Sequence, residues 1–99
     1  MIVIAGTAKI KPEMRKMAVA AALEMVVASE KEAGCKSYRF YIELEDENTI
    51  FIFEEWENDE ALAAHFETPH MATFRQKLPE LLASEPQILQ YEVVDVKSA

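Results

Sequence analysis

The stretch from residue 50 to residue 74 constrains the fold of this 99-residue chain more than any other part. It begins with the run IFIF at residues 50–53, which is apolar at both alternations of a strand. A strand with that pattern is normally covered on both faces. Asn58 and the pair Thr68-Pro69 follow as helix-start residues, because short polar side chains cap free N–H groups and proline fits a first turn. The stretch predicts strand, turn, helix, turn, helix.

The rest of the chain predicts one long helix and three further strands. The helix is expected to start at Lys11-Pro12 and to end at Gly34 in the position after the helix, a position that favours glycine. The strands are expected at residues 2–10, 35–44 and 87–96, with the central run extended to residues 49–57. Gly6 lies inside the first strand, which indicates a bulge or the close approach of another backbone. Pro79 should end or kink the third helix near Leu78.

An apolar stripe is expected along the long helix, at Met14, Met17, Ala21, Met25 and Ala28, which recur at steps of three and four, and it is widened by Ala18, Ala22 and Val26. The polar residues Glu30, Lys31 and Glu32 that follow are expected to be solvated.

This order of elements predicts a single α+β domain over residues 1–99. Four antiparallel strands with helices on one face form the ferredoxin-like βαββαβ arrangement. The other face of the predicted sheet is apolar as well, so it should be covered. A second copy laid sheet to sheet would cover it, which predicts a homodimer and a dimeric α/β barrel.

Composition excludes several classes of partner and site. The net charge of −8 disfavours nucleic acid and anionic membranes, both of which attract basic surfaces. No secretion signal and no membrane-spanning stretch is recognised, so a cytoplasmic protein is expected. Cys35 is the only cysteine and there are two histidines. A zinc site would then need carboxylates at spacings that the sequence does not show, so no metal is expected.

His65 is the first candidate for catalysis. Its ordinary pKa near 6.5 suits proton transfer at neutral pH. It shares a predicted helix face with Leu62 and Phe66, so it should point inward; it can equally be a buried structural histidine. His70 lies five residues further on, which is not a one-face metal pair, and is expected to be exposed or to act as a cap.

Glu54 is the second catalytic candidate. It shares a strand face with Ile50, Ile52 and Trp56. If that face meets the helices, Glu54 can bond and orient His65, as carboxylates do behind ligating histidines. Otherwise it is solvated at the strand end or lies in the dimer contact. The candidates for an apolar substrate pocket are Trp56, Phe66, Met71 and Phe74, all of which can also be ordinary core residues.

The predicted fold carries Glu54, Trp56, Asn58, Ala61, His65 and the run Thr68-Pro69-His70-Met71, with Gly34-Cys35 before the second strand. In these residues the chain resembles the antibiotic biosynthesis monooxygenase family, and within it the bacterial quinol monooxygenases. The resemblance implies a dimeric barrel that oxidises a hydroquinone, phenolic or polycyclic aromatic with molecular oxygen and without a cofactor. It supports the catalytic role considered for His65. The haem-degrading branch has a histidine in the third helix, where this chain has residues 73–76 (TFRQ), so haem is not expected.

Such chemistry asks little of the protein. A deprotonated hydroquinone reduces oxygen by itself, so a dry pocket, a base and a donor to the developing oxyanion suffice. No nucleotide-binding glycine pattern is present among two glycines. Two other functions stay open: a non-catalytic, small-ligand-binding or stress-associated dimeric barrel, and an isomerase-like enzyme on a small hydroxyketone signal with His65 as base.

Overall fold

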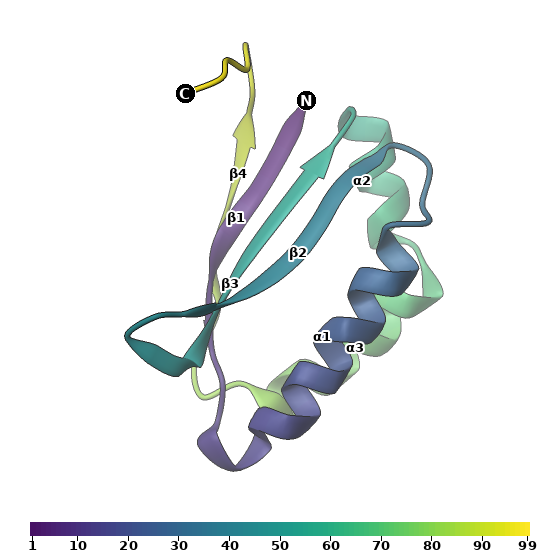
Figure 1. Cartoon of the computed structure of the whole chain (residues 1–99). Coiled ribbons are helices and arrows are strands. Elements are labelled where there is room, and N and C mark those ends of the chain that lie inside the picture. Colours follow the sequence, from purple (N-terminus) through teal and green to yellow (C-terminus); the bar gives the residue numbers. More distant parts are fainter.

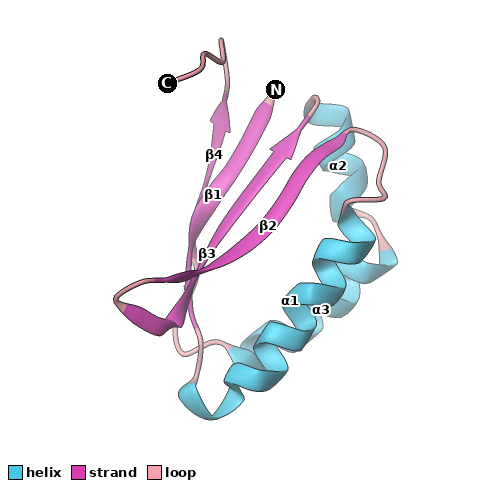
Figure 2. Ribbon diagram, viewed as in Figure 1, coloured by secondary structure: helices cyan, strands magenta, loops and turns pink.

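The computed structural model describes all of residues 1–99 and contains one sheet and one helical layer. Figure 1 shows the helices gathered on one face of the sheet, and Figure 2 separates the two layers by colour. The elements are β1 (Ile2–Lys9), a 3-10 turn (Pro12–Met14), α1 (Arg15–Ser29), β2 (Cys35–Glu43), β3 (Asp46–Trp56), α2 (Asp59–Phe66), α3 (Pro69–Leu81) and β4 (Gln87–Glu92).

The strand order is β2-β3-β1-β4 and every neighbouring pair is antiparallel. This confirms the α+β, ferredoxin-like prediction. No helix of the structure combines the length and apolar character needed to cross a bilayer.

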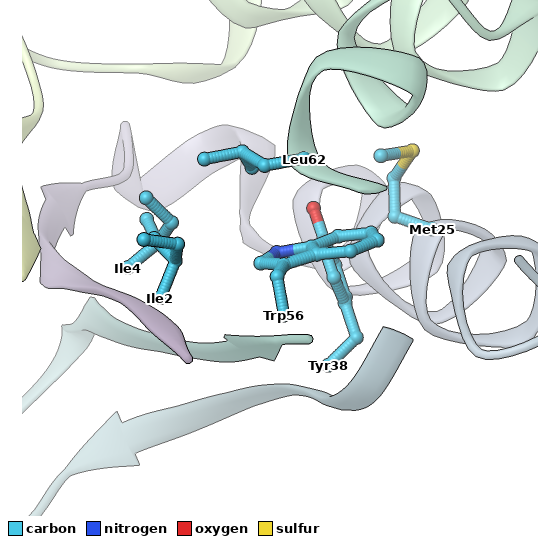
Figure 3. Packing of buried hydrophobic residues seen from close by; sticks show 6 residues of the cluster. All are labelled: Ile2, Ile4, Met25, Tyr38, Trp56 and Leu62. Atoms are coloured by element: carbon cyan, nitrogen blue, oxygen red, sulfur yellow. The ribbon is translucent and has the colours of Figure 1, made fainter. Parts of the chain in front are cut away.

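The face of β3 that carries Glu54 and Trp56 looks at the helices. Ile50, Ile52, Glu54 and Trp56 are all buried. Figure 3 shows Trp56 packed among residues of the sheet and of α1 and α2; this core cluster consists of Ile2, Ile4, Met25, Tyr38, Trp56 and Leu62. The alternative in which Glu54 is solvated or lies in a dimer contact is therefore wrong.

The predicted helix starts at Asn58 and Thr68 are confirmed. Asn58 Oδ1 accepts a hydrogen bond of 2.9 Å from the N–H of Ala61, which starts α2. Thr68 Oγ1 accepts from the N–H of Met71 at 3.3 Å and donates to the carbonyl of His65 at 2.7 Å. The end of α2 and the start of α3 are thus joined by one hydroxyl, and His65 is held immediately before the turn.

The first helix differs from its prediction. The chain makes a 3-10 turn first, and α1 ends at Ser29, so Gly34 is not the residue after the helix. Gly34 instead takes φ +81° in the connection to β2. Met17 is 58% exposed; the buried face of α1 is formed by Ala18, Ala21, Ala22, Met25 and Ser29. The small alanines let the helix lie close to the sheet and turn Met17 outward.

Three other boundaries also differ from the sequence prediction. β3 starts at Asp46, which pairs with Glu43, so the hairpin turn is tighter than expected. α3 continues through Pro79 to Leu81, because a proline in the last turn removes only one helical bond. β4 ends at Glu92, which pairs with Ile2 at the start of β1; one more bond follows, from the N–H of Val93 to the carbonyl of Met1.

The close approach expected at Gly6 is confirmed. A Cβ atom at this position would overlap the carbonyl oxygen of Gln87 and lie 2.5 Å from Cα of Ile88. The backbone of β4 therefore passes where a side chain of β1 would otherwise stand.

Gly6→Ala should destabilise the fold by about 1–3 kcal/mol, because the methyl group has to displace β4. The midpoint of urea unfolding measures this. Thr7→Ala, on the other face of the same strand, should cost less than about 1 kcal/mol. Equal midpoints for wild type and Gly6→Ala would contradict the packing of β4 on β1.

Candidate functional site

An apolar cavity of about 110 Å³ lies between the sheet and helices α1 and α3. Fourteen of its sixteen lining residues are hydrophobic, and Glu54 is the only charged one. An apolar cavity of roughly 150 Å³ in another protein accepts benzene, so this smaller space would have to widen to hold an aromatic ring. Ligand-binding pockets are typically lined by apolar side chains and a few polar groups, as this cavity is.

The predicted site residues divide around this cavity. Glu54, Met71 and Phe74 line it, together with Tyr38 and Phe40 of β2. His65, Trp56 and Phe66 are not among its lining residues. Phe66 lies at the surface, 40% exposed.

Glu54 is a carboxyl group held in an apolar environment. It is 7% exposed, and its Oε1 accepts a hydrogen bond of 2.9 Å from Trp56 Nε1. Burial raises its pKa to about 7; the Trp56 bond works against this rise, and the charge of Glu32 adds to it. Near neutral pH Glu54 therefore exists in both protonation states, as an acid–base group requires.

The expected bond between Glu54 and His65 is absent, and Glu32 takes that place. His65 Nδ1 lies 2.7 Å from Glu32 Oε2, and His70 Nε2 lies 2.8 Å from the same oxygen. The expectations of a solvated Glu32 and of an exposed or capping His70 are both wrong: their side chains are 13% and 27% exposed. The helix break at Thr68 turns the chain so that both rings reach one carboxylate.

His65 itself is 1% exposed. Burial lowers its pKa, while the bond to Glu32 opposes that change. Because Nδ1 faces a carboxylate, it carries the proton in the neutral ring. Nε2 is buried and has no hydrogen-bond partner in the protein.

Trp56 connects the two polar groups. Its ring centroid is 4.6 Å from that of His65, and its N–H reaches Glu54. Trp56 is fully buried, so its position is fixed by packing. The series Glu32, His65, Trp56, Glu54 therefore leads from the loop after α1 to the wall of the cavity.

Sequence reasoning missed Glu32, Tyr38 and the part played by His70. Tyr38 shares the buried alternation of β2 with Phe40, which was a signal for an inward phenol. Glu32 lies in an irregular connection, where no periodicity indicates the direction of a side chain. Its closeness to Gly34, whose positive φ turns the chain, was the only local signal.

A comparison with protein families shows to which family the chain belongs. The family model described as antibiotic biosynthesis monooxygenase matches residues 1–77. The chain belongs to the antibiotic biosynthesis monooxygenase family. The resemblance to this family seen in the sequence is thereby confirmed.

Two curated relatives of this family member extend over nearly all of its length. "Uncharacterized protein sll1783" of Synechocystis is 36% identical over 97 residues, which are 98% of this chain and 66% of that protein. "Putative monooxygenase YcnE" of Bacillus subtilis is 32% identical over 93 residues, 94% of this chain and 98% of that protein. This chain thus spans just under two thirds of the first relative and almost all of the second.

Solved structures share the fold. The structure of Rv0793 from Mycobacterium tuberculosis superposes with a TM-score of 0.91 at 24% identity, covering 98% of both chains. At that identity the likeness is one of fold.

Replacing the buried carboxyl should change how stability depends on pH. A pKa raised from 4.5 to about 7 means that folding favours the protonated form, so wild-type stability falls as pH rises from about 5 to 7 and then levels off. Glu54→Gln lacks this loss and can still accept the Trp56 bond. Its stability relative to wild type should rise between pH 5 and pH 8 by up to the order of 3 kcal/mol.

Urea unfolding at both pH values measures the difference. Glu57→Gln removes an exposed carboxylate immediately after β3 and should keep the wild-type pH profile. Parallel profiles for Glu54→Gln and wild type would show that Glu54 is an ordinary carboxylate.

Proposed function

We propose that this protein is a cofactor-independent monooxygenase that oxidises a hydroquinone or a related phenolic aromatic with molecular oxygen. One observation carries the proposal: the only charged group lining the apolar cavity is Glu54, whose pKa is about 7. Membership of the antibiotic biosynthesis monooxygenase family supports the reaction class, as does the name of the relative YcnE.

Glu54 acts as the base in this proposal. It removes the hydroxyl proton of the bound hydroquinone, whose anion then reduces oxygen. One oxygen atom enters the ring and the other leaves as water, so hydroquinone and O₂ give a hydroxylated quinone and water. The four electrons needed come from the substrate: two from forming the quinone and two from replacing a C–H bond by C–O.

Tyr38 serves as the donor to the anionic oxygen that develops. Burial raises the pKa of its phenol far above the usual range, and the charge of Glu54 adds to this rise, so the hydroxyl keeps its proton at working pH. A neutral donor in an apolar cavity stabilises an oxyanion more strongly than it would in water. Met71 and Phe74 supply apolar walls for the ring.

His65 has a different part from the acid–base role that the sequence suggested. It packs on Trp56, and Trp56 in turn holds Glu54. In the proposed reaction His65 is thus a positioning residue, and Trp56 positions the base rather than the substrate. Phe66 lies outside the proposed substrate site.

The outer face of the sheet is the proposed dimer surface. The side chains on the sheet face opposite to Glu54 include Tyr41, Phe51, Leu89 and Tyr91. All four are at least a third exposed. Contiguous apolar surface of this kind marks an interaction site, and a second copy of the same sheet matches it.

Oxygen uptake with menadiol tests the reaction. Wild-type protein should raise uptake above the spontaneous rate, with kcat/KM rising through pH 7 as Glu54 loses its proton. Glu54→Gln should lower turnover by about 10²–10⁴-fold because the base is lost. His65→Ala should lower it less, since His65 acts through Trp56.

The Glu57→Gln variant serves again as the matched control and should turn over at the wild-type rate. Saturable binding of the quinol without protein-dependent uptake across several quinols would instead identify a binding protein. Full activity of Glu54→Gln would leave the monooxygenase possible but remove Glu54 as its base.

The dimer is tested by sedimentation at micromolar concentration. Wild-type protein should sediment as a dimer, and Phe51→Lys should shift it toward the monomer, because a charge would be buried without a partner. Leu44→Lys, at the fully exposed hairpin tip, should leave the dimer intact. A wild-type monomer would contradict the sheet-to-sheet contact.

A further inference from the structure

Three potential metal ligands converge away from the cavity. One oxygen of Glu32 lies 2.7 Å from His65 Nδ1 and 2.8 Å from His70 Nε2. The ligand atoms of the three residues all lie within 4.8 Å of one another. They come from the connection after α1, the last turn of α2 and the first turn of α3. None of the three lines the apolar cavity.

A second observation concerns access and burial. His65 is held inside the protein, whereas the His70 side chain is 27% exposed and borders a surface pocket of about 180 Å³ between α1 and α3. The cluster therefore has a fixed inner ligand and an outer ligand that solvent reaches. A metal ion needs both features: an anchored ligand and a route in.

We infer that Glu32, His65 and His70 form a binding site for a divalent first-row transition metal ion, with Zn²⁺ as its simplest representative. Two imidazoles and one carboxylate are a common ligand set for such ions, and solvent would complete the coordination. Mg²⁺ and Ca²⁺ require oxygen ligands and do not fit.

Binding would require the three ligand atoms to move relative to one another. Ligand atoms around a tetrahedral zinc ion with bonds of about 2.0 Å are about 3.3 Å apart. The two oxygen–nitrogen distances would each have to open by roughly half an ångström. The two imidazole nitrogens, which lie up to 4.8 Å apart, would have to approach each other as well. The partly exposed ring of His70 and the carboxylate of Glu32 can supply these movements while His65 stays in place.

Without an ion, the same atoms form two hydrogen bonds from imidazoles to one carboxylate. The charges around the cluster do not decide between the hydrogen-bonded state and the metal-bound state. The net charge of −8 attracts a cation. Arg75, which donates to the carbonyl of Phe66, also lowers the pKa of His65 and opposes a cation nearby. The inference rests on the ligand atoms, and it is independent of the proposed function.

A bound ion would fasten three segments. It would fix the connection after α1 to helices α2 and α3 and hold His65 against Trp56. Its effect is on the stability of this end of the fold, because no reacting group is within the cluster.

Calorimetric titration of the tag-free, chelator-treated full chain with Zn²⁺ tests the inference. One Zn²⁺ ion should bind per chain, and the melting temperature should rise with Zn²⁺ concentration. His70→Ala and Glu32→Gln should each weaken binding by at least about tenfold. Mg²⁺ at the same concentrations should not bind.

Glu67→Gln is the matched control, since it removes an exposed carboxylate beside the same turn and should bind Zn²⁺ like wild type. If Glu32→Gln does not fold, His70→Ala alone decides, because this partly exposed side chain is not part of the hydrophobic core. Absence of saturable binding up to about 100 µM Zn²⁺ would overturn the inference, because structural zinc sites bind the ion at far lower concentrations. So would unchanged binding in His70→Ala.

Discussion

The contacts of Trp56 with His65 and Glu54 are the interactions on which the packing of α2 against the sheet depends. Trp56 leaves β3 on the helical side, packs on His65 of α2, and gives its only hydrogen bond to Glu54. A buried indole N–H without a partner would cost about 1–3 kcal/mol, so the carboxyl is needed where it is. The helical layer and the sheet are therefore joined by a polar contact inside an apolar core.

This arrangement has a cost in stability. A carboxyl group in an apolar cavity loses its hydration, and the single bond from Trp56 replaces only part of it. An apolar residue at this position would avoid that loss of hydration but would leave the N–H of Trp56 without an acceptor. Local features that lower stability without a compensating gain are typical of functional sites. The cost in stability at Glu54 therefore agrees with the catalytic role proposed for it, beside its structural role as the partner of Trp56.

The sequence predicted those parts of the molecule that local chemistry determines. The caps at Asn58 and Thr68, the buried alternation of β3 and the close approach at Gly6 each follow from one residue type at one position. Contacts between segments could not be read in the same way. Glu32 reaches two histidines only because the connection after α1 folds over α2 and α3, and the end of β4 depends on where β1 begins. The rotation of α1, which exposes Met17, depends on how closely the alanines allow it to approach the sheet.

The last strand has a consequence for how a ligand exchanges with solvent. β4 bonds to β1 alone, and every residue of it is exposed in the single chain. A strand held along one edge is among the segments that open at the lowest free energy, and its amides are the first to exchange with deuterium. Ile88 of β4 is also part of the cavity wall. Fluctuation of this one strand would therefore expose the interior, and a partner subunit that covered β4 would slow both amide exchange and the passage of ligand.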